Sequence, residues 1–412
     1  MQQSTIYTRN YLTFLILSLL LTAGVNIVTD PQRIFKIVDK VGFNHEKQSL
    51  KTNGFRKIKS IEILNNKNYN TLLIGSSRVG DGLNEKSTMF TPLTAYNTSI
   101  PGANMYEMYK IYQFAKQQGQ VKRIIVGLDF EFTFITPEVK GLADFTDSGF
   151  AGKNLLQMYW ENLVSLKTLQ HSADTIKFNR SGAKFSFESP YSNREQFDRH
   201  LKTESLRLLR IKSYSNPSMF EFLALMVEDC RKNNIELYLV IPPVHANNLE
   251  MLRALGLSTE FEQWKRKLVE IVDQNSTDFS SNKLVHLWDF SGYNDYSMEP
   301  IPDPKTNISM QWYSEFSHYR KALGDLVLQV MFSAPKLSLN IPSDFGVEIN
   351  KDNIEIHLAK IRADRDKYLQ IFPQEVVSLE KSVKEVKFSF QQSLQEDRQK
   401  QCLDFGKCTT TK

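Results

Sequence analysis

Short apolar runs alternate with amphipathic stretches along most of the chain. The runs of strand length lie at 71–74, 94–97, 123–130, 235–241 and 284–290. Between them, apolar residues recur at helical spacing and predict helices near 105–118, 217–233 and 259–272, and from His318 onward. Strands that alternate with helices in this way form parallel sheets covered on both faces. The pattern therefore predicts a three-layer α/β/α fold with a parallel sheet.

The N-terminal pattern is different, because residues 10–29 contain no charged side chain. The apolar segment is long enough for the roughly 30 Å of hydrocarbon in a bilayer. It is long for a signal peptide, and no convincing small-residue cleavage site follows it, so we expect an uncleaved transmembrane anchor. Positive charges also follow the segment, at Arg33, Lys36 and Lys40, so the positive-inside rule does not fix its orientation. Because an N-terminal anchor before one soluble domain usually exports that domain, we expect it to be extracytoplasmic, either periplasmic or at the cell surface.

These patterns divide the 412 residues into five parts. In the segment 131–215 the regular pattern breaks, apart from one helix expected near 154–170, and we interpret it as an insertion that forms a lid or substrate wall. Two apolar stripes separated by Pro373 predict helices between about 352 and 395, which either pack on the chain's own domain or bind a partner. The expected parts are a tail at 1–9, the anchor at 10–29, a juxtamembrane segment at 30–64, the α/β domain at 65–335 and a helical extension at 336–412.

Charge and cysteine content exclude some functions. The formal net charge of +5 is spread thinly, without the dense Lys/Arg block of a nucleic-acid groove, so no nucleic-acid partner is expected. Cys230 lies on an apolar helical face and reads as a core residue, whereas Cys402 and Cys408 could form a disulfide in an oxidising compartment. No His/Cys cluster has zinc-ligand spacing, so neither a metal nor another cofactor is predicted.

The candidate chemistry begins where the first strand ends, at Gly75-Ser76-Ser77. A serine in this position presents its hydroxyl at the carboxyl edge of the sheet, where open α/β sheets build their sites. Ser77 is the candidate nucleophile, and His318 is the candidate base that would activate it. Glu315 lies three residues before His318 and could orient its imidazole, with Asp289 and Asp295 as alternative acids. The three groups together indicate acyl-transfer chemistry.

An acyl-transfer site also needs N–H donors for the developing oxyanion. The candidates are the backbone N–H groups of Ser77 and Gly102 and the strand end at 127–129, which includes Asp129. Arg78 follows the nucleophile directly and could hold a carboxylate or phosphate of the substrate, or form a surface salt bridge.

The order of these motifs resembles the SGNH (GDSL-like) hydrolase superfamily, over roughly residues 65–130 and 235–333. With its N-terminal anchor, the chain is similar to the exported branch that includes the proteins that O-acetylate alginate and the lipoteichoic-acid D-alanylation protein. The resemblance implies that Ser77 is the nucleophile, Gly102 the oxyanion glycine of the second block, and His318 the base.

Three residues depart from the pattern of this superfamily. Ser76 stands where the family has Asp before the nucleophile, Asp129 stands where it has Asn, and Glu315 replaces the Asp of Asp-x-x-His. An ionised Asp129 would repel an oxyanion, so it must be protonated or turned away, or the oxyanion hole is built differently. The departures fit a transferase or specialised branch, and also a lineage without catalysis.

The resulting prediction is a membrane-anchored O-acyltransferase or esterase that acts on a cell-envelope polysaccharide through an acyl-serine. The resemblance implies a membrane-bound O-acyltransferase partner that supplies the acyl group, and a glycan acceptor. The alternative is a non-catalytic envelope protein that binds glycan or this partner. A third, weaker interpretation is a simple secreted esterase.

Overall fold

The computed structural model consists of two compact units. The first comprises Met1–Tyr69, Lys110–Gln120 and Pro137–Ser189, and the second comprises Asn70–Tyr109, Val121–Thr136 and Pro190–Lys412. The residues described are 2–47, 54–66, 68–131, 133–134, 145–182, 192–211, 217–274, 283–306, 308–332 and 341–405.

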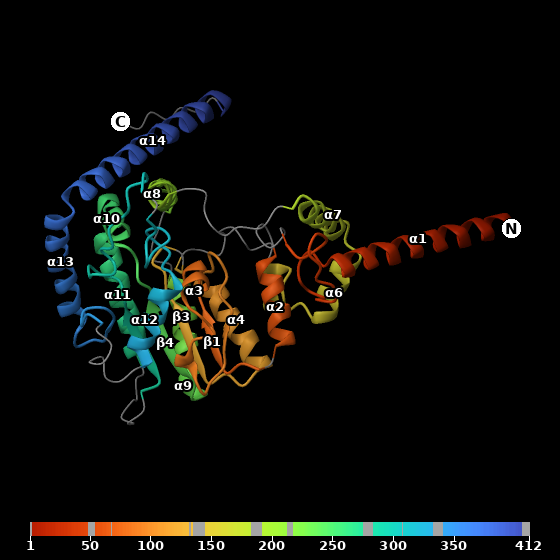
Figure 1. The fold of residues 1–412 in the computed structure, drawn as a ribbon, viewed down its shortest axis with the longest axis horizontal. Coiled ribbons are helices and arrows are strands. Elements are labelled where there is room, and N and C mark those ends of the chain that lie inside the picture. Colours follow the sequence, from red (N-terminus) through yellow and green to blue (C-terminus); the bar gives the residue numbers. More distant parts are fainter. Residues whose placement is uncertain are drawn as a thin grey trace. The chain divides into compact units, whose positions relative to one another are not determined.

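The first unit is helical. Its core contains Ile34, Ile61 and Met158. The helix α1 is long and apolar enough over Thr5–Thr29 to cross a membrane, and it projects from α6 and α7, which contact its C-terminal end (Figure 1). The elements of this unit are α1 (Gln2–Thr29), α2 (Phe55–Asn65), η3 (Gly149–Ala151), α6 (Leu155–Leu163) and α7 (Leu166–Arg180).

Where the sequence predicts one helix near 154–170, the structure has two, so that prediction is wrong. Asn154 starts α6 with a capping box, in which its side chain bonds the N–H of Gln157 and the Gln157 side chain bonds back. Ser165 then caps α7 by accepting a hydrogen bond from the Thr168 N–H. The break occurs because Ser165 offers the backbone a second helix start within a continuous apolar pattern.

The second unit contains a six-stranded sheet, ordered β2-β1-β3-β4-β5-β6. The first five strands in the chain are parallel, whereas β6 pairs antiparallel with β5. The α/β class is therefore confirmed, but the sheet is mixed rather than parallel throughout. With two residues, β6 is too short for its pattern to be recognised. The strands are β1 (Thr71–Ile74), β2 (Ala95–Asn97), β3 (Arg123–Gly127), β4 (Glu236–Ile241), β5 (Val285–Asp289) and β6 (Val347–Glu348).

Helices surround this sheet, and α14 lies across α8 and α10 (Figure 1). The predicted helices at 217–233 and 259–272 are present, as is the break at Pro373, whereas α8 and α10 were not predicted. The helix predicted from His318 begins only at Lys321. Cys230 is buried, as expected, and the proposed Cys402–Cys408 disulfide falls outside the side chains that are described. The helices are α3 (Ser77–Gly82), α4 (Met105–Gln118), α8 (Asn193–Arg210), α9 (Pro217–Lys232), α10 (Ala246–Leu255), α11 (Ser258–Asp273), α12 (Lys321–Phe332), α13 (Ile354–Ile371) and α14 (Pro373–Phe405), with a 3-10 turn η2 (Thr88–Phe90). From Lys110 onward, α4 belongs to the first unit.

Candidate active site

The order of the strands places a topological switch point between β1 and β3. From β1 the chain moves to the edge strand β2, and then crosses to β3 on the other side of β1. In open α/β sheets, the carboxyl ends of strands at such a switch point carry the binding site. Ser77 follows β1 and Asp129 follows β3, so both candidate residues lie at this point.

The local sequence fixes Ser77 at the first position of α3. Ser76 is the N-cap, and its hydroxyl accepts a hydrogen bond from the Arg78 N–H at 3.2 Å. The same hydroxyl donates to Oδ2 of Asp129. The Ser77 N–H belongs to the first turn of α3, where backbone donors have no intrahelical acceptor. Ser77 is only half-buried.

His318 lies in a tight loop rather than on a helix. A bridge between Tyr313 and Tyr319 closes the loop, and the Ser314 N–H donates to the His318 carbonyl at 3.0 Å. Glu315 lies within the same loop and is buried, with only 3% of its surface exposed. The loop therefore holds the base and its candidate acid in one rigid piece.

The structure brings three predicted residues together as a candidate triad: Ser77, His318 and Glu315. Ser77 Oγ lies 2.7 Å from His318 Nε2, and His318 Nδ1 bonds Oε1 of Glu315. Ser317 adds two hydrogen bonds to the Glu315 carboxylate, from its Oγ at 2.8 Å and its N–H at 2.9 Å. This is the geometry in which a histidine takes the proton of an attacking serine while a carboxylate orients the ring.

Electrostatics favour the ionised form of Glu315. Burial disfavours its charge, but the hydrogen bond and charge of His318 outweigh that penalty and lower the pKa of Glu315 to about 2. Burial also opposes charging of His318, yet the hydrogen bond and negative charge of Glu315 leave the His318 pKa above its usual value. The candidate triad therefore has an acid that is charged at neutral pH and a base with a raised pKa.

Beside the candidate triad, Arg78 holds two buried carboxylates. Its Nη1 donates to Asp129 at 3.2 Å and to Glu131 at 3.0 Å, and its Nη2 donates to Glu131 at 3.2 Å. All three residues are at least 95% buried. Arg78 therefore forms an internal ion pair, where the sequence offered a substrate contact or a surface salt bridge. Asn248 and Arg207 complete the network by donating to the Glu131 carboxylate and carbonyl.

The two carboxylates in this network titrate differently. Burial raises the pKa of Asp129, against the opposing charge of Arg78 and the hydrogen bond from Ser76. Burial acts on Glu131 as well, but the charge and the two hydrogen bonds of Arg78 outweigh it and lower the Glu131 pKa. Glu131 is thus the ionic partner of Arg78, and Asp129 is the carboxyl more readily protonated. A protonated Asp129 would remove the repulsion that an oxyanion meets from a carboxylate.

The other candidate oxyanion donors differ in their availability. The N–H of Leu128 donates to the Val240 carbonyl at 2.8 Å, and the N–H of Asp129 donates to Thr133 Oγ1 at 2.8 Å. These N–H donors at the end of β3 are therefore already bonded within the fold, which makes them poorer candidates for the oxyanion. Gly102 has φ +69 in the exposed turn before α4, a conformation that suits glycine. The Ser77 and Gly102 N–H groups remain the better candidates.

The alternative acids lie in other environments. Asp289 is buried and bonds Lys265, His357 and Ser291, and Asp295 is exposed.

Sequence reasoning missed Glu131 and Ser317 because neither matches a motif position. Their proximity to Asp129 and His318 in the chain is the only signal that could have found them.

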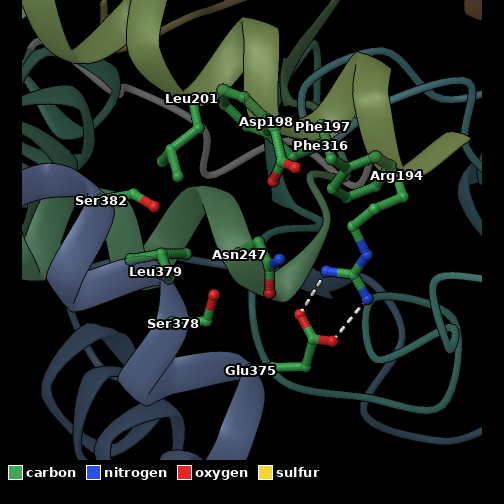
Figure 2. A pocket seen from close by; sticks show the side chains of 10 residues that line it. All are labelled: Arg194, Phe197, Asp198, Leu201, Asn247, Phe316, Glu375, Ser378, Leu379 and Ser382. Atoms are coloured by element: carbon green, nitrogen blue, oxygen red, sulfur yellow. Dashed lines mark hydrogen bonds and ion pairs between the residues drawn. The ribbon is translucent and has the colours of Figure 1, made fainter. Parts of the chain in front are cut away.

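The loop of the candidate triad is supported from behind by the C-terminal extension. Phe316, between Glu315 and Ser317, is buried and lines a small pocket between α8 and α14. Figure 2 shows Arg194 of α8 paired with Glu375 of α14 across this pocket. Arg194 Nη1 lies 2.7 Å from Glu375 Oε2, and Nη2 lies 2.5 Å from Oε1. The Phe316 carbonyl also accepts a hydrogen bond from the His245 N–H at 3.0 Å. The extension thus forms part of the frame of the site.

Two glycines set the distance between the two halves of the candidate triad. A Cβ on Gly324 of α12 would lie 1.9 Å from the Gly82 carbonyl oxygen of α3, and one on Gly82 would lie 2.1 Å from the Tyr319 ring. Only glycine permits this approach. Since Ser77 is on α3 and His318 precedes α12, the contact keeps the hydroxyl close to the imidazole.

We expect Gly324→Ala to destabilise the protein by about 1–3 kcal/mol through overpacking and to slow acylation of Ser77 by separating it from His318. Thermal unfolding and the rate of labelling by an activated ester measure the two effects. Gly292→Ala is the matched control, because its nearest neighbour would be Ile361 Cγ1 at an ordinary 3.7 Å. Equal stability and labelling in the two variants would contradict the role of this contact.

Comparison with models of known protein families finds no match to this chain. Comparison with curated protein sequences finds no match either. The function is therefore argued from the geometry of the site.

Proposed function

We propose that the chain is a membrane-anchored, serine-dependent O-acyltransferase with an SGNH-like three-layer fold, acting on a cell-envelope polysaccharide outside the cytoplasm. The observation that carries the proposal is the 2.7 Å contact between Ser77 Oγ and His318 Nε2, with Glu315 on the other ring nitrogen. Serine is a weak nucleophile without such a base. A buried acid, a base of raised pKa and a half-buried serine at a sheet switch point together favour acyl transfer.

In the proposed reaction, Ser77 Oγ attacks the carbonyl carbon of an acyl ester donor while the Ser77 proton moves to His318 Nε2. The tetrahedral intermediate collapses when Nε2 gives this proton to the leaving alkoxy oxygen of the donor, and the acyl group remains on Ser77. A glycan hydroxyl then attacks the acyl-serine, with Nε2 accepting its proton and finally returning it to Ser77 Oγ. Glu315 stays ionised throughout and stabilises the imidazolium, consistent with its lowered pKa. The N–H groups of Ser77 and Gly102 would stabilise the oxyanion.

An anchor that remains attached is supported by the way α1 ends. Asn26 of α1 is fully buried, and its amide donates to three carbonyls at the end of α6 and just before α7. Asn44 donates to the carbonyls of Val28 and Thr29. Removal of α1 would leave these buried polar groups without partners, which is costly. The end of α1 therefore belongs to the folded unit.

Transfer rather than hydrolysis requires that water be kept from the acyl-serine. We assign this role to Glu131 and α8, which belong to the 131–215 segment and adjoin the site through the Arg207 contact with the Glu131 carbonyl at 3.0 Å. A membrane-bound O-acyltransferase would supply the acyl group, and the glycan would accept it. Rapid turnover of soluble short-chain esters without an acceptor would instead favour a simple esterase.

The test is mass spectrometry of the full chain in detergent after incubation with an activated acetyl ester or a serine-directed phosphonate. We expect one adduct, located at Ser77 by peptide mapping, and its loss in Ser77→Ala. Ser181→Ala is the matched control, because Ser181 is an exposed serine that should leave labelling unchanged. A folded protein that forms no adduct would contradict the proposal and favour the non-catalytic envelope protein that binds glycan or the acyltransferase.

A further inference from the structure

The helix α6 is apolar on both sides, although only one side faces the core of its unit. Met158 is fully buried against Ile34 and Ile61. On the opposite side, Leu156 is 80% exposed and Trp160, one turn later, is 63% exposed. Leu166, at the start of α7, is 76% exposed. A helix on a soluble surface would present polar residues here. We call these three residues, Leu156, Trp160 and Leu166, the α6–α7 apolar surface.

This surface is fixed to the C-terminal end of α1. The Asn26 amide donates to the carbonyls of Asn162, Leu163 and Ser165 at 3.1, 2.9 and 3.3 Å. Ser172 of α7 donates to Asn26 Oδ1 at 3.0 Å. The end of α6 and the start of α7 are thus tied to one residue of α1. The apolar surface cannot move away from α1 without breaking buried hydrogen bonds.

The length of α1 places this junction at the boundary of a bilayer. From Arg9, whose long side chain can reach the head groups, to Val25, an α-helix is about 24 Å long at 1.5 Å per residue, which is close to the roughly 30 Å of the hydrocarbon core. Asn26, the next residue, is the one bonded to α6 and α7. If α1 crosses a membrane, the α6–α7 apolar surface begins where the hydrocarbon ends, at the depth that tryptophan side chains prefer.

We propose that the α6–α7 apolar surface is inserted in the lipid head-group region of the same membrane that α1 crosses. The inference rests on the proposed anchor but not on the chemistry of Ser77. The lipid is favoured as the occupant because the helices that carry the surface are hydrogen-bonded to the end of the membrane-spanning helix. Leu156 and Trp160 would lie in the interface as the apolar face of an interfacial helix does.

A second segment of the same unit supports the proposal. The loop after α1 exposes Ile37 and Val41, and it is held rigidly because the Asp30 carboxylate accepts N–H bonds from Ile34 at 2.7 Å and Lys36 at 2.7 Å. Asn44 ties the loop to the last carbonyls of α1. Exposed apolar side chains therefore occur on both segments that are bonded to the membrane end of α1. The first unit would thus be held at the membrane by more than one contact.

The test uses the fluorescence of Trp160 in the full chain, reconstituted in phosphatidylcholine vesicles. Subtracting the spectrum of Trp160→Phe isolates Trp160 from the other three tryptophans. We expect lipids brominated near the glycerol backbone to quench this difference signal more strongly than lipids brominated near the chain ends, because tryptophan prefers the interface. Leu166→Trp in the Trp160→Phe background should report the same depth.

Other outcomes overturn the proposal and remain distinct from failure of the proposed function. Quenching of Trp160 by aqueous iodide, but not by brominated lipid, would mean that the surface faces water in the purified protein. If Trp160 were then shielded from iodide in native membranes alone, a protein partner would be its occupant. Resistance of the chain to alkaline extraction tests the anchor separately, and Ser77 labelling tests the chemistry.

Discussion

Glu315→Gln is expected to lower the rate of Ser77 acylation by roughly 10³–10⁴-fold, because removing the charge of the orienting acid leaves the histidine in the wrong tautomer. In the structure Glu315 is the carboxylate bonded to His318 Nδ1. The side-chain amide of glutamine could donate a hydrogen bond to Nδ1, which would favour the tautomer with the proton on Nε2, and that tautomer cannot accept the proton of Ser77. The effect should approach that of His318→Ala.

The same variant carries a pH signature that a purely structural role would not produce. Acylation requires neutral His318, so the rate rises with pH through the His318 pKa. That midpoint should lie above the usual histidine value of about 6.5, because Glu315 raises the His318 pKa. In Glu315→Gln the raising charge is gone while burial still acts, and the midpoint should move to lower pH. Stopped-flow labelling at a series of pH values measures both the rate and the midpoint.

Asp295→Asn serves as the control, because Asp295 is an exposed carboxylate that the sequence also offered as the acid. It should keep the wild-type rate and the wild-type midpoint. A large loss in Asp295→Asn, with Glu315→Gln unaffected, would contradict the assignment of Glu315 and require a different geometry of the loop during turnover.

The pairing of Ser77 with His318 shows what the sequence could predict. The two residues are 241 positions apart, yet a serine after one strand and a histidine before a late helix both carry local signals. Their meeting follows from the parallel sheet, since the carboxyl ends of its strands share one edge. The Glu315 loop was also predictable, because the acid and base are close in the chain.

The environment of Arg78 shows what the sequence could not predict. An arginine directly after a candidate nucleophile at the sheet edge favours a surface position, and nothing local indicates that it is buried between Asp129 and Glu131. That arrangement depends on the register of β1 against β3, whose pairing brings the two strand ends together. The short strand β6 and the helix α10 were missed for a related reason, because tertiary contacts define them more than periodicity does.

Asp289 illustrates how burial decides between a catalytic and a structural acid. Its Oδ2 lies 2.6 Å from Lys265 Nζ and 2.9 Å from His357 Nε2 of α13. Lys265 is itself 1% exposed and lies over the Phe261 ring. These contacts join α11, the end of β5 and the C-terminal extension in one buried ionic cluster. Asp289 is thus a structural acid that helps to hold the C-terminal extension in place.

Lys265→Met is expected to destabilise the protein by about 3–5 kcal/mol, because it leaves the Asp289 carboxylate buried without its cation. Methionine keeps most of the apolar stem of lysine, so the loss reports charge rather than packing. Lys267→Met is the matched control on the same helix. The Lys267 side chain is 43% exposed and pairs with Glu270 at 2.8 Å, and its loss should change the free energy of unfolding by less than about 1 kcal/mol.

Two further measurements separate this ionic cluster from simple packing. In the double variant Lys265→Met/Asp289→Asn no unpaired carboxylate remains, so part of the lost stability should return. Comparison of the wild type with the two single variants and the double variant gives the coupling free energy between Lys265 and Asp289. Burial opposes the Asp289 charge, but Lys265 and His357 outweigh it, so the Asp289 pKa is lowered. Its contribution to stability is present above the unfolded pKa of about 3.9 and is lost as the pH falls through the folded pKa.

In Lys265→Met, burial acts on Asp289 without the cation and should raise its pKa, so the carboxyl becomes neutral already in mildly acidic solution. The stability gap between the wild type and Lys265→Met should therefore narrow as the pH falls, whereas a packing defect would give a gap that does not depend on pH. Thermal unfolding of the full chain in detergent, followed by circular dichroism between neutral pH and about pH 4, decides between them. A constant gap, together with no recovery in the double variant, would contradict the ionic role of Lys265.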